Sequence, residues 1–217
     1  MPDDADAFRR AAAEAAALEV RAGMTIGYGT GRAAFAALEA LARRKLDVRG
    51  VPTSQRTADL CRRLELRLTT LEESPRLDLV LDGADEIDPD KQALKGGGGA
   101  HVREKLVALA AQRRLFVIEE SKLVARLGST RGIPVAIVPF GARATLARIA
   151  ERFPGATFRE ELSDDGAALA DVPLAAGADL RQVAAALKST PGVIDHGLFL
   201  DLSPELFVGG PRGVRRL

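Results

Sequence analysis

Hydrophobic positions recur at helical spacing near the start of the chain and in short runs further along. Residues 5–22 place an apolar stripe on one side and charged side chains on the other, which predicts a surface helix packed on a core. Short apolar runs then alternate with helical patterns rich in Ala and Leu, which predicts strands alternating with helices. The predicted strands cover residues 24–28, 48–51, 77–81 and 115–118, and the predicted helices cover residues 32–44, 54–64 and 100–112.

This alternation indicates an α/β fold with a mostly parallel sheet and right-handed crossovers. After about residue 128 the order changes to the βαββαβ arrangement of ferredoxin-like folds. A tail hairpin, residues 205–208 and 214–217, is expected to return to the first domain. We therefore expect a Rossmann-like domain at residues 1–130 and 201–217 and a smaller ferredoxin-like α+β domain at residues 131–200. The six segments of the smaller domain are residues 134–138, 143–152, 156–162, 166–172, 179–187 and 192–200.

Composition excludes several classes of protein. The 217 residues are 47% hydrophobic and 28% charged, as is usual for a globular protein. Lys and Arg number 31 against 30 Asp and Glu, so the net charge of +1 offers no field for nucleic acid or an anionic membrane. Without a signal peptide or a spanning apolar run, we expect a cytoplasmic protein. Cys61 is the only cysteine and His101 and His196 are the only histidines, which excludes disulfides and zinc clusters.

A glycine-rich turn follows the first predicted strand. Gly27-Tyr28-Gly29-Thr30-Gly31 opens a helix, where free backbone N–H groups and the helix dipole suit a phosphate. A dinucleotide fingerprint requires Gly or Ala where Arg32 stands, so the pattern disfavours NAD. A purely structural turn is the alternative. Lys122, after the predicted strand 115–118, is a second candidate for neutralising a phosphate, with a solvated charge as its alternative.

Acidic residues cluster at the end of another predicted strand. Asp82-Gly83-Ala84-Asp85-Glu86-Ile87-Asp88 follows the apolar run 77–81, at the edge of a parallel sheet where ligands collect. Asp82 and Asp85 flank two small residues and are suited to hold sugar hydroxyls. A solvated loop and a Mg²⁺ site are the alternatives.

Four consecutive glycines form the most unusual stretch. Lys95 precedes Gly96-Gly97-Gly98-Gly99, and Glu104 follows in the first turns of a predicted helix. Ordering four glycines is entropically costly, so we expect another group to approach this backbone closely. The lysine stands before the glycines, unlike the lysine of a nucleotide-binding P-loop. We interpret Glu104 as a carboxylate directed at the same crevice as Lys95, with compensation of the helix dipole as the alternative.

Taken together, these stretches resemble the A-type ribose-5-phosphate isomerase family over essentially the whole chain. The most specific matches are residues 82–88 and 95–99 with Arg103-Glu104-Lys105, at the family's relative spacing. Supporting matches occur at Gly29-Thr30-Gly31, Ser121-Lys122-Leu123-Val124, Pro134-Val135, Val138-Pro139-Phe140, Asp164-Asp165-Gly166, Pro191-Gly192-Val193 and Gly197-Leu198-Phe199.

The resemblance implies reversible interconversion of ribose 5-phosphate and ribulose 5-phosphate in the pentose phosphate pathway, without metal or organic cofactor. Glu104 would move a proton between C1 and C2 through an enediolate, and Lys95 with the glycine-loop amides would stabilise the oxyanion. Asp82 and Asp85 would bind hydroxyls and assist ring opening. The implied substrate-binding residues are Thr30, Gly31, Arg32, Ala33, Asp82, Gly83, Ala84, Asp85, Lys95, Gly96, Gly97, Gly98 and Lys122.

The first loop departs from the family pattern. The family continues Gly-Thr-Gly with Ser-Thr, whereas Arg32-Ala33 follow here, so we expect the Arg32 guanidinium to bind phosphate, with a solvent-facing position as the alternative. Arg9 stands where the family commonly has a basic residue that reaches the phosphate. By resemblance, the Rossmann-like domain is catalytic, the ligand is a small sugar phosphate, and the assembly is a homodimer or homotetramer. A non-catalytic sugar-phosphate-sensing module is the rival interpretation, which Lys95 and Glu104 disfavour.

Overall fold

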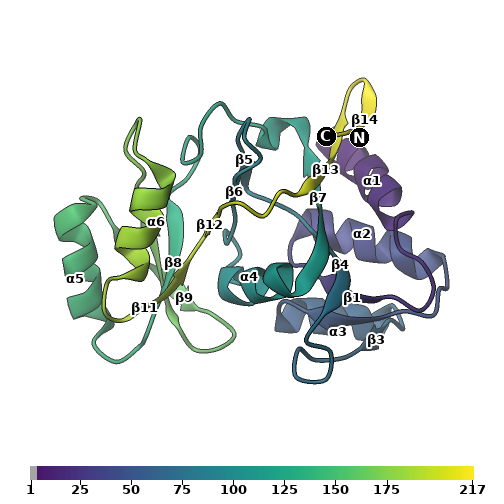
Figure 1. The fold of residues 1–217 in the computed structure, drawn as a ribbon, viewed down its shortest axis with the longest axis horizontal. Coiled ribbons are helices and arrows are strands. Elements are labelled where there is room, and N and C mark those ends of the chain that lie inside the picture. Colours follow the sequence, from purple (N-terminus) through teal and green to yellow (C-terminus); the bar gives the residue numbers. More distant parts are fainter. Residues whose placement is uncertain (1–3) are drawn as a thin grey trace. The chain divides into compact units, whose positions relative to one another are not determined.

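A computed structural model describes residues 4–217, which form two compact units (Figure 1). Unit 1 contains the residues up to 84 together with 103–123 and 202–217, and unit 2 contains 85–102 and 124–201. The domain division expected from the sequence instead places 85–102, 124–130 and 201 in the first domain. The difference arises because β5 (Glu86–Ile87) and β6 (Ala93–Leu94) form a three-stranded sheet with β12 (Leu198–Phe199), in the order β12-β6-β5.

Unit 1 is built on a seven-stranded sheet in the order β14-β13-β7-β4-β1-β2-β3. Neighbouring strands are parallel, except that β13 and β14 form an antiparallel hairpin. The predicted mostly parallel α/β fold and the return of the tail hairpin are therefore confirmed. The strands are β1 (Thr25–Tyr28), β2 (Arg49–Pro52), β3 (Arg67–Leu68), β4 (Leu77–Asp82), β7 (Ala111–Glu119), β13 (Glu205–Gly210) and β14 (Gly213–Arg216).

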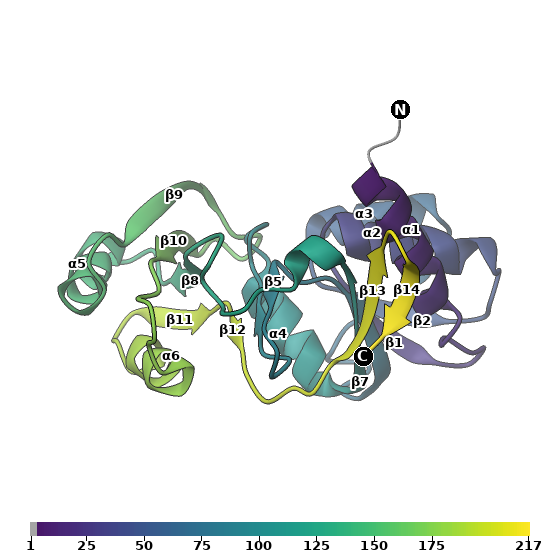
Figure 2. The same ribbon diagram turned by 90° about the horizontal axis from the view of Figure 1, so that it is seen from above.

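Helices cover both faces of this sheet, as the apolar runs of its strands require. Ile26 and Tyr28 of β1 join the core beneath α1 (Asp4–Ala17) and α2 (Arg32–Arg43), while Gly27 faces Val107 of α4 (His101–Ala110) on the opposite side. Figure 2 shows α4 and α1 on opposite sides of β13 and β7. The remaining helix, α3 (Gln55–Arg63), follows β2.

Two helix boundaries differ from the sequence expectation. The predicted helix 5–22 ends at Ala17, because residues 18–23 turn toward β1. The predicted helix 100–112 ends at Ala110, because β7 begins at the next residue and runs to Glu119. Within residues 4–217, none of the helices is long and apolar enough to cross a membrane.

Unit 2 contains a four-stranded antiparallel sheet in the order β11-β8-β10-β9. The predicted βαββαβ order is confirmed, and α5 and α6 pack on one face of the sheet (Figure 1). The predicted strand 192–200 divides at Gly197, where a Cβ atom would collide with the carbonyl oxygen of Lys95. The elements are β8 (Ile133–Ile137), α5 (Ala142–Arg152), β9 (Thr157–Leu162), β10 (Ala168–Val172), α6 (Leu180–Lys188) and β11 (Val193–His196).

A charged network joins three strands at the edge of the unit 1 sheet. Arg113 of β7 donates hydrogen bonds of 2.7 and 3.0 Å to the two carboxylate oxygens of Glu205 of β13. Arg113 also donates to Glu19, and Arg216 of β14 donates to Glu205 over 2.5 Å. The hydrogen bond from Arg113 is the main cause that lowers the pKa of Glu205 to about 2, against the opposing effect of burial.

We predict that this network makes stability depend on acid pH. The folded-state pKa of Glu205 lies below its ordinary value of 4.5, so its ionised form stabilises the folded protein fully above that pH. The contribution is lost as the pH falls toward about 2. The E205Q variant should be less stable at neutral pH by about 1 kcal/mol, since the pair is partly exposed. Urea unfolding of both proteins across this range measures the difference, which should shrink as the pH falls. A gap that stays constant with pH would contradict the prediction.

Candidate active site

Loops of unit 1 follow the carboxyl ends of four adjacent parallel strands, β7, β4, β1 and β2. Thr30 follows β1, Thr53 follows β2, and Asp82 ends β4. Lys122 ends the short helix η1 (Glu120–Lys122) after β7. Because parallel strands end at the same edge of a sheet, these side chains share the edge where α/β proteins bind ligands.

A cluster of four hydroxyl groups lies at this edge. The Thr30 Oγ1 atom is 2.7 Å from Thr53 Oγ1 and 2.8 Å from both Ser54 Oγ and Thr57 Oγ1. Ser54 caps α3 and accepts a 3.0 Å hydrogen bond from the Thr57 N–H. Sequence reasoning missed Thr53, Ser54 and Thr57, although a Ser at a helix start with Thr three residues later is a recognisable capping signal. The buried hydroxyls of Thr53 and Thr57 donate to the carbonyl oxygens of Tyr28 and Gly29 over 3.1 and 3.0 Å, so they hold the loop after β1 in place. Thr30 is the only member of the cluster that is not buried.

Asp82 is buried where the loop after β1 meets the end of β4. The Gly29 N–H donates a 2.9 Å hydrogen bond to the Leu81 carbonyl oxygen, and a Cβ at Gly29 would collide with the Asp82 carboxylate. Glycine at this position therefore permits the close approach. The Asp82 Oδ1 atom accepts a 2.8 Å hydrogen bond from the Gly83 N–H, and a Cβ at Gly83 would lie 3.3 Å from that of Ala33.

Glu104 is buried in the first turn of α4. Val107, one turn later, packs so closely on β1 that any side chain larger than that of Gly27 would overlap it. Because α4 connects the parallel strands β4 and β7, it runs back from the carboxyl edge of the sheet. Glu104 therefore lies nearer that edge than Val107 does.

The basic residues expected at the phosphate lie in different surroundings. Arg9 is buried, and its guanidinium donates to the carboxylates of Glu119 and Asp6. These two acids compensate its charge, which counts against the expected phosphate contact. Arg32 is the first residue of α2 and is exposed, so its side chain has room either to reach a ligand or to remain in solvent.

Within unit 2, Lys95 follows β6 and is 2% exposed. Its N–H donates a 2.9 Å hydrogen bond to the carbonyl oxygen of Gly197. Its Nζ atom lies 5.6 Å from the centre of the Phe199 ring, within the range of a cation–π interaction. The side chain of Lys95 is thus held at a defined place although it carries a flexible stem.

Asp85 connects two loops of unit 2. Its Oδ2 atom accepts a 2.7 Å hydrogen bond from the Gly97 N–H, and its Oδ1 atom lies 3.0 Å from Nη1 of Arg131. Sequence reasoning missed Arg131, because its contact with Asp85 joins distant parts of the chain. In the described part of the chain, no three His, Cys, Asp or Glu side chains are grouped so that they could hold a metal ion.

The glycine loop, residues 96–99, uses its glycines for different reasons. Gly96 and Gly99 adopt positive φ angles of 106° and 78°, which disfavour other residues. A Cβ at Gly96 would lie 2.7 Å from Cβ of the buried His101, and one at Gly99 would lie 2.8 Å from Leu169 Cδ1. The expected close approach is therefore made here by groups of the protein itself.

The two middle glycines differ from each other. A Cβ at Gly97 would overlap the guanidinium of Arg131, whereas a Cβ at Gly98 would meet no atom within 4 Å. The Gly98 backbone thus has room beside it that no side chain of the described structure fills. Gly98 is also exposed, so its backbone is open to approach by a ligand.

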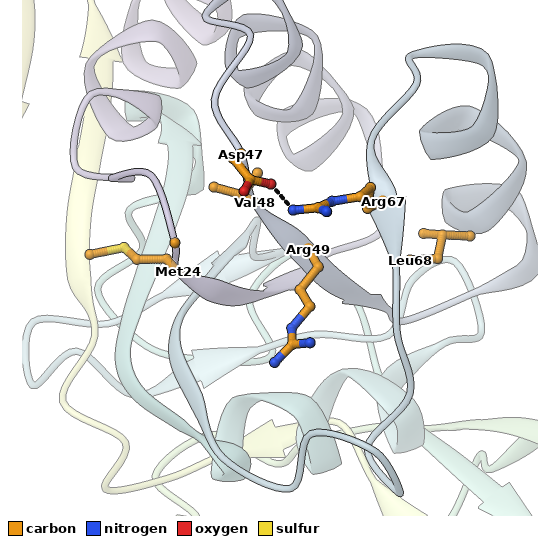
Figure 3. A pocket seen from close by; sticks show the side chains of 7 residues that line it. Met24, Asp47, Val48, Arg49, Arg67 and Leu68 are labelled. Atoms are coloured by element: carbon orange, nitrogen blue, oxygen red, sulfur yellow. Dashed lines mark ion pairs between the residues drawn. The ribbon is translucent and has the colours of Figure 1, made fainter.

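A pocket of about 240 Å³ lies elsewhere in unit 1. Figure 3 shows its side chains around the ion pair between Arg67 and Asp47, with the Arg49 side chain pointing away from that pair. Its lining residues precede or begin the strands β1, β2 and β3, so they lie at the amino ends of these strands. It is therefore not part of the carboxyl edge described above.

Comparisons with known proteins identify the family. Ribose 5-phosphate isomerase A (phosphoriboisomerase A) is the family that matches residues 49–213. Ribose-5-phosphate isomerase A of Synechococcus sp. (strain JA-3-3Ab) is 42% identical, over 98% of this chain and 97% of the relative. The Caulobacter sp. (strain K31) enzyme of the same name is 44% identical, over 98% of both chains.

Solved structures give the same answer. Ribose 5-phosphate isomerase A from Methanocaldococcus jannaschii has a TM-score of 0.92 at 32% identity, over 97% of this chain and 98% of that one. A D-ribose-5-phosphate isomerase in complex with phospho-erythronic acid has a TM-score of 0.93 at 27% identity, over 98% of both chains. By sequence and by fold, this chain belongs to the ribose 5-phosphate isomerase A family.

Proposed function

We propose that this protein interconverts ribose 5-phosphate and ribulose 5-phosphate. The observation that carries the proposal is full-length membership of the family together with the presence of Asp82, Asp85, Lys95 and Glu104 at the family's spacing. The solved relative bound to phospho-erythronic acid adds support. That molecule is a phosphorylated sugar acid whose planar, anionic carboxylate resembles an enediolate.

In the proposed reaction, Glu104 is the general base. Its carboxylate removes the proton on C2 of the open-chain aldose, and the electron pair forms the C1–C2 double bond of an enediolate as the C1 carbonyl oxygen becomes an oxyanion. The same carboxyl group returns the proton to C1. The proton on the C2 hydroxyl is transferred to the C1 oxygen, so the ketose forms with no net gain or loss of atoms.

Lys95 and the glycine loop stabilise the negative charge in this proposal. A buried ammonium directed by its surroundings stabilises an oxyanion more strongly than one in water. The N–H of Gly97 is already donated to Asp85. We therefore assign the next amide, that of the exposed Gly98, to the substrate.

Asp82 and Asp85 bind sugar hydroxyls and assist ring opening in the same proposal. The phosphate is bound by Thr30 and Gly31 with Lys122, at the N-termini of α2 and α3. Gly83, Ala84, Ala33 and Gly96 contribute backbone or small side chains around the substrate. We further propose a cytoplasmic enzyme that assembles as a homodimer or homotetramer and uses no metal or organic cofactor.

We predict that E104Q abolishes most of the isomerase activity. Glutamine keeps the size of the side chain but cannot accept the C2 proton, so kcat should fall by about 100-fold or more. Conversion of ribose 5-phosphate to ribulose 5-phosphate in buffer with EDTA measures the effect. The matched control is E39Q, since Glu39 is an exposed glutamate on α2 and its substitution should leave kcat unchanged.

Two results would contradict this assignment. Activity of E104Q close to that of the parent would remove Glu104 as the base. A parent protein that binds ribose 5-phosphate without converting it, with or without added Mg²⁺, would favour the sugar-phosphate-sensing module.

The open space beside Gly98 generates another prediction. G98A should fold with the stability of the parent to within about 0.5 kcal/mol, because the new methyl group meets no protein atom. It should lower kcat/KM by about 10-fold or more, because the methyl group occupies space that the substrate oxygen needs. Thermal unfolding and steady-state kinetics test the two parts separately. Unchanged kinetics would show that the substrate does not approach Gly98.

The exposed position of Arg32 generates a further prediction. If its guanidinium binds the phosphate, R32A should raise KM several-fold and leave kcat nearly unchanged, because the contact is the same in the ground and transition states. R10A is the control, since Arg10 is an exposed arginine of α1. Equal KM values for R32A and R10A would show that Arg32 faces solvent.

A further inference from the structure

Arg159 of β9 reaches the glycine loop, although more than sixty residues separate them in the sequence. Its Nη1 atom donates hydrogen bonds of 2.9 Å to the carbonyl oxygen of Gly96 and 3.2 Å to that of Gly97. The side chain is only 14% exposed, which is unusual for an arginine in an edge strand. Both partners belong to unit 2, as Arg159 does.

Asp171 of β10 holds the other side of this guanidinium. The Nε atom of Arg159 donates to Asp171 Oδ2 over 2.8 Å, and Nη2 donates to Oδ1 over 2.6 Å. This two-pronged pair fixes the plane of the guanidinium, so Nη1 is directed at the loop. The pair therefore leaves the orientation of Nη1 little freedom.

The glycine loop also rests on the same face of the unit 2 sheet at its other end. Ala170 and Val172 of β10 pack in the core beneath α5 and α6, so Leu169 and Asp171 face the opposite way. A Cβ at Gly99 would lie 2.8 Å from Leu169 Cδ1. The loop is thus supported by an apolar contact at Gly99 and by polar contacts at its first two carbonyl groups.

The direction of the carbonyl groups determines the direction of the amides. A peptide unit is planar and trans, so its N–H points away from its C=O. When the carbonyl oxygens of Gly96 and Gly97 turn toward Arg159, the N–H groups of Gly97 and Gly98 point to the opposite side. The Gly97 N–H accordingly meets the carboxylate of Asp85.

We propose that Arg159, oriented by Asp171, is a positioning residue of the reaction. Together with the 3.0 Å hydrogen bond from the Gly99 N–H to the Gly96 carbonyl oxygen, it sets the two peptide planes that present the Gly98 N–H to the substrate oxyanion and the Gly97 N–H to Asp85. It does not touch the substrate itself. This inference rests on the isomerase activity proposed above and adds a side chain of the smaller sheet to its machinery.

Lysine is a poor substitute in this position. The planar guanidinium donates hydrogen bonds to Asp171 from two nitrogens and to the loop carbonyls from the third. An ammonium group has a single nitrogen and cannot reach both sets of acceptors in this geometry. R159K should therefore restore only part of what R159Q removes. R159Q leaves the Asp171 carboxylate without its guanidinium partner. The double variant R159Q/D171N removes this unpaired charge as well, so it provides a second test.

Arg181 offers a matched control within the same unit. It also forms a two-pronged pair with an aspartate, Asp201, but both side chains are well exposed. Arg181 donates through Nη1 and Nη2, so R181Q removes a two-pronged arginine–aspartate pair that has no hydrogen bond to the glycine loop. Kinetics and amide hydrogen exchange of the segment 95–100 are measured for the parent, R159Q, R159K, R159Q/D171N and R181Q.

We expect R159Q to lower kcat by about 10-fold or more with a smaller change in KM, because amide orientation matters most when the oxyanion has formed. R159Q/D171N should lose no more activity than R159Q, because Asp171 acts only through Arg159. R159K should lie between R159Q and the parent. Exchange in the segment 95–100 should be faster in R159Q than in R181Q, whose kinetics should match the parent.

The outcomes separate two kinds of failure. If the parent and R181Q convert the substrate and R159Q does so within twofold of them with equal exchange, the inference is wrong while the proposed function stands. Equal loss of kcat in R159Q and R181Q also overturns it, because the effect would then be one of general stability. If neither the parent nor R181Q has activity, the proposed function fails and the inference fails with it.

Discussion

A buried carboxylate needs hydrogen-bond donors, and this requirement shapes the loops of unit 2 around Glu86. Glu86 is fully buried and accepts hydrogen bonds of 2.5 Å from the N–H groups of Gly128 and Thr130, with a third of 3.3 Å from that of Ser129. That loop leads directly to Arg131, which contacts Asp85. The buried carboxylate of Glu86 thus fixes the segment that supplies Arg131, the partner of Asp85.

The same requirement explains why an acidic run can be accommodated in a folded protein. Residues 82–88 contain four carboxylates, yet each has donors of its own. Asp82 accepts from the Gly83 N–H, and Asp85 and Glu86 accept from separate loops. Asp88 accepts a 2.8 Å hydrogen bond from the Gln92 N–H, although burial still raises its pKa. Side chains that look alike in the sequence therefore have different functions in the fold.

Periodicity was enough to predict the parallel sheet and the βαββαβ order, because both follow from burial along single segments. Periodicity could not place the short strands β5 and β6, because two residues are too few to show an alternation of hydrophobic and polar positions. The sheet that they form with β12 also depends on residues far away in the sequence. The family resemblance supplied the expected site residues. Arg131 and Arg159 could not be identified from the sequence. An arginine in a loop or an edge strand gives no local signal of the carboxylate or carbonyl group that it contacts in the fold.

The hydroxyl cluster shows which groups remain at this edge of the sheet although Arg32-Ala33 replace the family's Ser-Thr in the first loop. Replacing Ser-Thr by Arg32-Ala33 removes two neutral donors from the start of α2, but Thr30 remains within 2.8 Å of the hydroxyls of Ser54 and Thr57. These groups lie at the N-terminus of α3, where the helix dipole favours an anion whatever the side chains of α2 are. The cluster is therefore built by the loops after β1 and β2, and it does not depend on the side chains that stand at the start of α2.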